Sequence, residues 1–300
     1  MNIATTILKR LFLPPHIFRV FSLQRNRKRI DRSADDAQLK LYHDILPGDY
    51  LHYGYFENPN IHPLDMSFRM IYEAQDNYGK KLTSLITDVN NPVFDVGCGM
   101  GGLLAQLNSM NLEAIGLTPD VNQIKHIRSK YPNEVIHSKF EDLDAAKFPK
   151  HFGTLITSES LQYLKLDLAL PLIKQILKDG CKWIACDYFK VGSQGEKSGH
   201  NWELFESKLK EFDFKITFKE DITPHILPTI GYAHFWATKI GVPLKNYGLG
   251  KLKVKAPGIH YVIETILPKI DEKIDKNIQT VDPEVFAKNK RYILMVIEQN

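Results

Sequence analysis

The stretch that most constrains this chain comprises residues 93–102 and reads Val-Phe-Asp-Val-Gly-Cys-Gly-Met-Gly-Gly. An apolar run that ends in an acid, followed by glycines at alternate positions and a helix-forming sequence, predicts a strand, a tight turn and a helix start. Gly97, Gly99 and Gly101 lack the side chains that would keep a ligand off the backbone, and a helix N-terminus leaves N–H groups unpaired. The turn is therefore a candidate ligand-binding site.

Short apolar segments alternate with amphipathic segments on both sides of this turn. A strand is expected at the start of 93–102, further strands at 112–117, 134–137, 152–157 and 182–187, and helices at 67–86, 119–130 and 169–177. This alternation predicts an α/β fold with right-handed crossovers and a doubly wound, mostly parallel sheet that has helices on both faces. Ligands of such sheets bind outside the carboxyl ends of the strands, where the Gly97 turn lies.

The last third of the chain has a different pattern. A helix is expected at 202–212, a strand at 214–218 and a closing strand at 291–297. Residues 224–284 lie between the last two strands and are rich in aromatic residues and glycine, so they are interpreted as a helical lid or substrate subdomain whose aromatics wall an apolar pocket or form the lid's own core. The predicted organisation is an arm and cofactor-covering segment at 1–66, a core at 67–223 and 285–300, and the lid.

The N-terminal arm carries most of the basic character of the chain. Residues 1–32 contain eight Lys and Arg residues and one Asp, whereas the whole chain has a net charge of only +4. The arm is also amphipathic, a pattern that suits peripheral contact with an anionic membrane or organelle targeting, but amphipathicity alone more often marks a helix docked on its own domain. Lys9 and Arg10 interrupt its apolar residues, so a membrane span is not predicted.

The three cysteines, Cys98, Cys181 and Cys186, are too few for a disulfide framework and are not spaced as zinc ligands. Their number favours a reducing compartment and therefore a cytoplasmic protein, and no metal site is expected. Beyond Arg32 the chain is net acidic, which disfavours nucleic acid as a partner.

The spacing of the glycines limits the ligand. A dinucleotide site would have the pattern Gly-x-Gly-x-x-Gly, whereas this chain has Gly97-x-Gly99-x-Gly101. Asp95, two residues before the first glycine, would crowd a pyrophosphate but could hold a cationic amino group. A ligand with an amino-acid end, a ribose and an adenine, but no phosphate, satisfies both conditions, and S-adenosylmethionine is such a ligand.

Residues 93–102 resemble the first motif of the class I S-adenosylmethionine-dependent methyltransferases. Segments 116–118, 140–143 and 158–161 follow in the expected order, so the resemblance covers about 67–187 and the final strand. Within the class, 116–118, 122–123 and 51–56 are most similar to a branch of cyclopropane fatty acid synthases, tocopherol-type methyltransferases and small-molecule methyltransferases. The resemblance implies a Rossmann-like, seven-stranded sheet and methyl transfer to a small-molecule or lipid-like acceptor.

The resemblance also implies which residues bind the cofactor. Asp95 is expected near the amino group, Gln123 or Asp120 at the ribose, and adenine between Thr118 and Phe140, with its amine bound by Glu141 or Asp142. Cys98 is interpreted as a small residue that fills the turn. The full predicted set is Tyr53, Asp95, Gly97, Cys98, Gly99, Gly101, Thr118, Asp120, Gln123, Phe140, Glu141 and Ser158.

Candidate catalytic residues face the predicted strand ends. The strongest are Glu159, Tyr163 and His200, and their role would be to take a proton from the acceptor. For any single histidine, a hydrogen-bonded or surface role is the competing interpretation. Two other functions stay open: a catalytically silent partner subunit that binds the S-adenosyl ligand, and a nicotinamide-dependent oxidoreductase.

Overall fold

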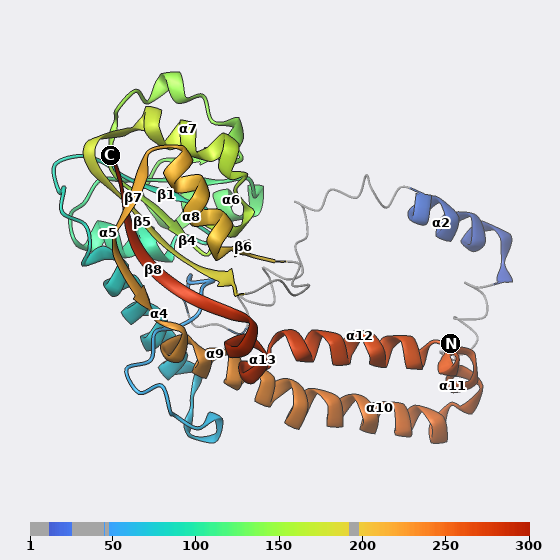
Figure 1. Cartoon of the computed structure of the whole chain (residues 1–300). Coiled ribbons are helices and arrows are strands. Elements are labelled where there is room, and N and C mark those ends of the chain that lie inside the picture. Colours follow the sequence, from blue (N-terminus) through green and yellow to red (C-terminus); the bar gives the residue numbers. More distant parts are fainter. Residues whose placement is uncertain (1–11, 26–44, 46–47, 192–197) are drawn as a thin grey trace.

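The computed structural model describes residues 12–25, 45, 48–191 and 198–300. They form an α/β domain with a central sheet between two layers of helices, from which a helical hairpin projects (Figure 1). In the described residues the sheet contains β1 (Val93–Val96), β2 (Ala114–Thr118), β3 (Val135–His137), β4 (Phe152–Ser158), β5 (Leu177–Lys190), β6 (His200–Asn201), β7 (Phe214–Asp221) and β8 (Lys290–Gln299).

The strand order is β3-β2-β1-β4-β5-β8-β7, with the short β6 beside β5. Strands β1 to β6 pair in parallel, whereas β8 is antiparallel to both β5 and β7. The order reverses between β1 and β4, which is the crevice where doubly wound sheets bind ligands. The predicted doubly wound, mostly parallel sheet is confirmed, and β6 adds a two-residue strand to the seven expected.

Each face of the sheet has its own apolar core. All four residues of β1 are buried, and successive residues point to opposite faces because the side-chain period of a strand is two. Phe94 stacks on Phe152 in one core, with ring centroids 4.3 Å apart, whereas Val93 belongs to the other core. A central strand that is buried on both faces explains why this segment is continuously apolar apart from Asp95.

Two sets of helices cover these cores. The face of Val93 is covered by α4 (Phe68–Thr83), α5 (Gly102–Ser109) and α6 (Val121–Lys130), and the face of Phe94 by α7 (Leu166–Ile176) and α8 (Trp202–Glu211). The remaining short helices are 3-10 turns: η2 (Pro63–Asp65), η3 (Phe140–Asp142), η4 (Ala145–Lys147) and η5 (Leu161–Tyr163).

Several element boundaries differ from the sequence predictions by a few residues, among them the starts of α6 and β5. Helix α6 begins at Val121 instead of residue 119, because the Asp120 carboxylate accepts the N–H groups of Asn122 and Gln123 and so caps the helix. Strand β5 begins at Leu177 instead of residue 182. Strand β5 pairs with β4 at Leu177 and again from Lys182 onward, and the register shifts between these two points. Gly180, which has a φ of +74°, lies in the interval.

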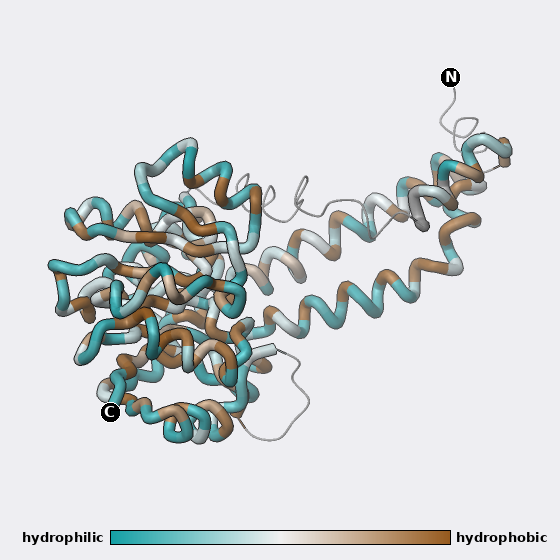
Figure 2. The backbone as a smooth tube through the Cα atoms, turned by 90° about the horizontal axis from the view of Figure 1, so that it is seen from above, coloured by the Kyte–Doolittle hydropathy of each residue, from teal (hydrophilic) through white to brown (hydrophobic). Residues whose placement is uncertain are grey.

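The predicted lid is helical, and most of it projects away from the domain. It comprises α9 (Thr223–Trp236), the π-helical turn η6 (Ala237–Gly241), α10 (Val242–Lys255), α11 (Pro257–Glu264), α12 (Leu267–Thr280) and α13 (Pro283–Asn289). Helices α9 and α13 contact each other and pack against β8, whereas α10 and α12 extend outward and α11 forms the tip (Figures 1 and 2). We refer to α10, α11 and α12 as the hairpin.

The aromatic residues of this insertion have different environments. Tyr232 is buried with Met66, and Trp236 stacks on Phe68, so these residues anchor α9 to the domain. Tyr247 and Tyr261 lie in the hairpin and are exposed. The last two therefore neither wall a pocket nor form a core in this structure, and a lid role for residues 224–284 stays a prediction.

The N-terminal arm is described only at residues 12–25, which include helix α2 (Pro14–Arg25), so the predicted membrane contact of residues 1–32 falls largely outside the described residues. In the described part, Phe12, Phe18 and Phe21 are exposed. None of the described helices is long and apolar enough to cross a lipid bilayer.

Candidate functional site

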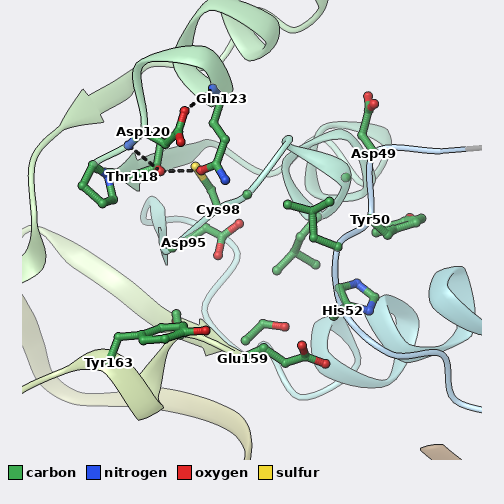
Figure 3. Close-up of a pocket in the computed structure, with 18 residues that line it drawn as sticks. Asp49, Tyr50, His52, Asp95, Cys98, Thr118, Asp120, Gln123, Glu159 and Tyr163 are labelled. Carbon is green, nitrogen blue, oxygen red and sulfur yellow. Dashed lines mark hydrogen bonds between the residues drawn. The ribbon is translucent and has the colours of Figure 1, made fainter. Parts of the chain in front are cut away.

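A cavity of about 420 Å³ opens at the carboxyl ends of β1, β2 and β4 (Figure 3). It lies at the switch in strand order, where the sequence predicted a ligand. The residues that line it are Asp49, Tyr50, Leu51, His52, Asp95, Gly97, Cys98, Gly99, Gly102, Leu103, Thr118, Pro119, Asp120, Gln123, Ser158, Glu159, Ser160 and Tyr163.

The glycine turn forms one wall of this cavity. Gly97 has a φ of +83°, and a Cβ atom on it would lie 2.5 Å from the Cβ of Ser160. A Cβ atom on Gly99, whose φ is +55°, would lie 3.3 Å from Leu51. Because a side chain would clash at Gly97 and would be strained and crowded at Gly99, the backbone of the turn is itself the surface that a ligand would contact.

Asp95 lies at the end of β1 and is almost completely buried. Its Oδ2 atom has no hydrogen-bond partner among the described residues, and burial raises the pKa of this carboxyl group to about 7. A buried acid without a partner is costly, and a cationic group that binds beside it would stabilise the ionised form. The wall next to the glycine turn therefore favours a ligand with a positively charged donor.

Polar side chains at the end of β2 are joined by hydrogen bonds. The Thr118 hydroxyl donates to Oε1 of Gln123 at 2.5 Å and accepts the N–H of Asp120 at 3.2 Å. These contacts fix the orientation of Thr118 and Gln123 at the cavity (Figure 3). Their arrangement leaves the amide of Gln123 able to donate to a hydroxyl-rich ligand.

Glu159 follows β4 with a φ of +53°, a conformation that is uncommon for a residue with a side chain. Its Oε1 accepts the N–H of Tyr53 at 2.8 Å and the hydroxyl of Tyr292 at 2.6 Å. Burial raises the pKa of Glu159 to about 7, and both hydrogen bonds oppose this shift because they favour the charged form. The result is a fixed carboxyl group that is able to exchange a proton near neutral pH.

Residues 49–52 cover the cavity from the side of α4 and α6. Asp49 contacts His126 at 3.0 Å and Lys130 at 2.6 Å. The ring of His52 stacks on Tyr78 with centroids 4.2 Å apart, and burial lowers the pKa of His52 to about 4. These contacts hold a segment that is more than 40 residues upstream of the glycine turn against the site.

Most of the predicted site residues line this one cavity. They are Asp95, Gly97, Cys98, Gly99, Thr118, Asp120, Gln123, Ser158, Glu159 and Tyr163. Tyr163 lies at the rim with 76% of its surface exposed. Sequence reasoning missed Asp49, Tyr50, Leu51 and His52. The aromatic cluster at 51–56 marked this neighbourhood, and only Tyr53 was selected from it.

The other predicted residues lie off the cavity lining. Phe140 is buried in the core beside Phe94 and is not among the residues that line the cavity, and Glu141 accepts the N–H of Lys165 at 2.8 Å. His200, on β6, has its Nε2 atom 3.0 Å from the carbonyl oxygen of Leu161. These contacts give Phe140, Glu141 and His200 structural partners away from the cavity.

Tyr53 and Gly101 support the site without lining it. The ring of Tyr53 packs edge-on against Phe286 and Tyr292, and its backbone N–H donates to Glu159 in the site. Gly101, with a φ of +91°, is the N-cap of α5. A Cβ atom there would lie 3.0 Å from Ile127 and Tyr131, so Gly101 allows α5 and α6 to approach each other.

Residues 94–185 match the family described as a methyltransferase domain. No curated protein matches the chain in sequence. Solved structures resemble it over most of its length, including the (4+2)-cyclase SpnF, with a TM-score of 0.64 and 15% identity over 88% of this chain and 93% of that one.

A geranyl diphosphate C-methyltransferase from Streptomyces coelicolor A3(2), in complex with Mg²⁺, geranyl diphosphate and S-adenosyl-L-homocysteine, has a TM-score of 0.63 and 12% identity over 87% of this chain and 93% of that one. The cyclopropane synthase MmaA2 from Mycobacterium tuberculosis has a TM-score of 0.58 and 14% identity, and the alignment covers 83% and 89% of the two chains. At these identities the likeness is one of fold.

The glycine turn provides a direct test of this site. Gly97→Ala would introduce both an unfavourable φ and a clash with Ser160, and we expect it to lower the melting temperature and remove binding of S-adenosylhomocysteine. The matched control is Gly180→Ala, because Gly180 has a similar φ of +74° but no heavy atom within 4 Å of an added Cβ. Equal effects of the two substitutions on melting and on calorimetric binding would show that the contact with Ser160 is unimportant.

Proposed function

We propose that this chain, in which residues 94–185 match a methyltransferase domain, is an S-adenosylmethionine-dependent methyltransferase that transfers the methyl group to a small-molecule or lipid-like acceptor. The observation that carries the proposal is the buried Oδ2 of Asp95 beside the Gly97 turn, which has no hydrogen-bond partner in the part of the chain that the structure describes. An amino-acid ligand would supply the missing cationic partner, and the glycine turn would leave room for it.

The residues of the cavity fit such a cofactor. Asp95 would hold its amino group, the backbone at Gly97 and Gly99 would contact its amino-acid and ribose parts, and Thr118 with Gln123 would bind ribose hydroxyls. These assignments use donors and acceptors that line one cavity, and the carboxylate of Asp95 has a free acceptor position among the described residues. When bound, the cofactor supplies a methyl group that is activated by a positively charged sulfur.

The contribution of the protein is alignment and proton transfer. Displacement at a methyl group needs the acceptor atom to approach the methyl carbon from the side opposite the leaving sulfur. The fixed walls of the cavity favour such an alignment. Where the acceptor must lose a proton, Glu159 would accept it, because its carboxyl group lines the cavity and titrates close to neutral pH. The bonds from Tyr53 and Tyr292 hold that carboxyl group in place.

The class of acceptor is inferred from the relatives in fold. One of them is solved with geranyl diphosphate and another is named a cyclopropane synthase, so similar domains act on small or lipid-like molecules. The exposed Tyr163 marks the open rim of the cavity, where an acceptor would enter.

The proposal is tested by two measurements on the full chain. Calorimetric titration should give binding of S-adenosylmethionine and S-adenosylhomocysteine but not NAD, and binding of NAD alone would favour an oxidoreductase. Radiolabelled methyl transfer would then be measured with prenyl diphosphates, unsaturated phospholipids and small amines as acceptors. Binding without transfer to any of them would favour a silent partner subunit, and a (4+2)-cyclase of similar fold shows that the fold is not restricted to one reaction.

The pKa of Asp95 predicts a pH dependence of cofactor binding. The carboxyl group must be ionised to hold an ammonium group, and its pKa in the free protein is about 7. Below that pH binding must release a proton, so the affinity for S-adenosylhomocysteine should fall by up to about tenfold per pH unit. Calorimetry at several pH values between about 8 and about 5.5 measures this slope.

Two variants assign that slope to one residue. Asp95→Asn should weaken binding by at least roughly tenfold at pH above 7 and remove the pH dependence. Glu159→Gln changes the other cavity acid with a pKa of about 7 and should keep the slope. A slope that is lost in Glu159→Gln and kept in Asp95→Asn would contradict the assignment.

Glu159→Gln is also expected to slow methyl transfer. The amide keeps the shape of the side chain but cannot accept a proton, so turnover should fall by about 10²- to 10⁴-fold while cofactor affinity changes little. Wild-type turnover in Glu159→Gln would reduce Glu159 to a packing role.

Tyr292→Phe removes one hydrogen bond that favours the charged form of Glu159, so it should raise the pKa of Glu159 and move the acidic limb of the pH–rate profile to higher pH.

A further inference from the structure

The tip of the hairpin, which we define as residues 251–269 around α11, exposes large apolar side chains. Val254 is 80% exposed, Tyr261 72%, Val262 62% and Ile266 49%. In the described part of the chain, none of the residues in α10, α11 or α12 is buried. The hairpin projects away from the sheet domain in both views (Figures 1 and 2), so nothing in the described structure covers its tip.

The exposed side chains of the tip do not form a single flat face. Tyr261 and Val262 are consecutive in α11, so their side chains leave the helix about 100° apart. Both are nevertheless exposed, as is Val254 at the end of α10. A protein partner would need a pocket that surrounds such a tip, whereas the interfacial layer of a bilayer accepts apolar side chains that point in several directions.

The charges of the tip are complementary to an anionic surface. Residues 251–269 contain four lysines and a single acid, Glu264, and the lysines are Lys251, Lys253, Lys255 and Lys269. The rest of α12, which we call the shaft, follows the tip. It carries both signs of charge, because it contains Asp271, Glu272 and Asp275 as well as lysines. Positive charge is thus concentrated where the apolar side chains are most exposed, a combination that binds anionic membranes.

We propose that the hairpin tip, residues 251–269, docks on an anionic membrane surface. Val254, Tyr261 and Val262 enter the interfacial layer, and the lysines contact lipid phosphates. The 14 residues of α10 place this contact roughly 20 Å from the root of the hairpin. The hairpin thereby tethers the catalytic domain to the surface, and this docking does not depend on the reaction that the domain performs.

The experiment uses the full chain and sedimentation with vesicles of phosphatidylcholine alone or mixed with phosphatidylglycerol. We expect binding to the mixed vesicles that weakens as salt is added. Val254→Glu combined with Tyr261→Glu should reduce the partition coefficient by at least roughly tenfold. Leu64→Glu combined with Val89→Glu is the matched control, because both residues are exposed apolar side chains on the sheet domain.

A second pair of variants tests the charge. Lys253→Glu combined with Lys255→Glu reverses charge at the tip, whereas Lys273→Glu combined with Lys276→Glu makes the same change on the shaft. We expect the tip pair to lose binding and the shaft pair to retain most of it. All these residues are exposed, so circular dichroism should give the same helix content in every variant.

Several outcomes would overturn the proposal. Absence of wild-type binding to anionic vesicles would do so, as would wild-type levels of binding in either of the two variants with substitutions at the tip. Binding that is lost instead in Phe18→Glu combined with Phe21→Glu would assign membrane contact to the N-terminal arm. A dimer in sedimentation velocity that dissociates on substitution of Val254 and Tyr261, without vesicle binding, would make a second copy the occupant of the tip.

Discussion

The site depends on how closely the turns after β1 and β4 approach each other. The Ser160 hydroxyl donates to the carbonyl oxygen of Val96 at 2.5 Å. Ser160 also lies so close to Gly97 that there is no room for a side chain on Gly97. This contact brings Asp95 from one strand and Glu159 from its neighbour into the same cavity. A glycine at position 97 is therefore a packing requirement as well as a property of the ligand-binding turn.

The cavity concentrates buried acids, and they cost stability in the free protein. Burial raises the pKa of Asp95 and Glu159 to about 7, and that of the neighbouring Asp187 to about 8. Each acid binds its proton more tightly in the folded chain than in the unfolded one, so folding stability falls as the pH rises from about 4 towards these values. A cationic ligand at Asp95 would offset part of this loss, which links cofactor binding to stability.

Local sequence was sufficient to predict the strand, the turn and the polar end of β2, because these parts are contiguous in the chain. It predicted a cofactor-covering segment before the core but could not predict that His52 or Tyr292 would be the residues involved, because their places depend on long-range contacts such as the bond between Tyr292 and Glu159. The resemblance to the methyltransferase family placed Phe140 beside the adenine, and its burial in the core depends on packing against Phe94, which lies far from it in the sequence. The direction of the hairpin likewise depends on where α9 and α13 attach, and not on its own pattern.

The central claim is that Asp95 and the glycine turn hold the amino-acid end of S-adenosylmethionine. A crystal structure of the full chain with S-adenosylhomocysteine tests it most directly. We predict the amino group of the ligand within about 3.2 Å of Asp95 Oδ2, with the backbone at Gly97 and Gly99 in contact with the ligand. A ligand bound with a phosphate- or ribose-sized group beside Asp95, or with its amino group elsewhere in the cavity, would contradict it.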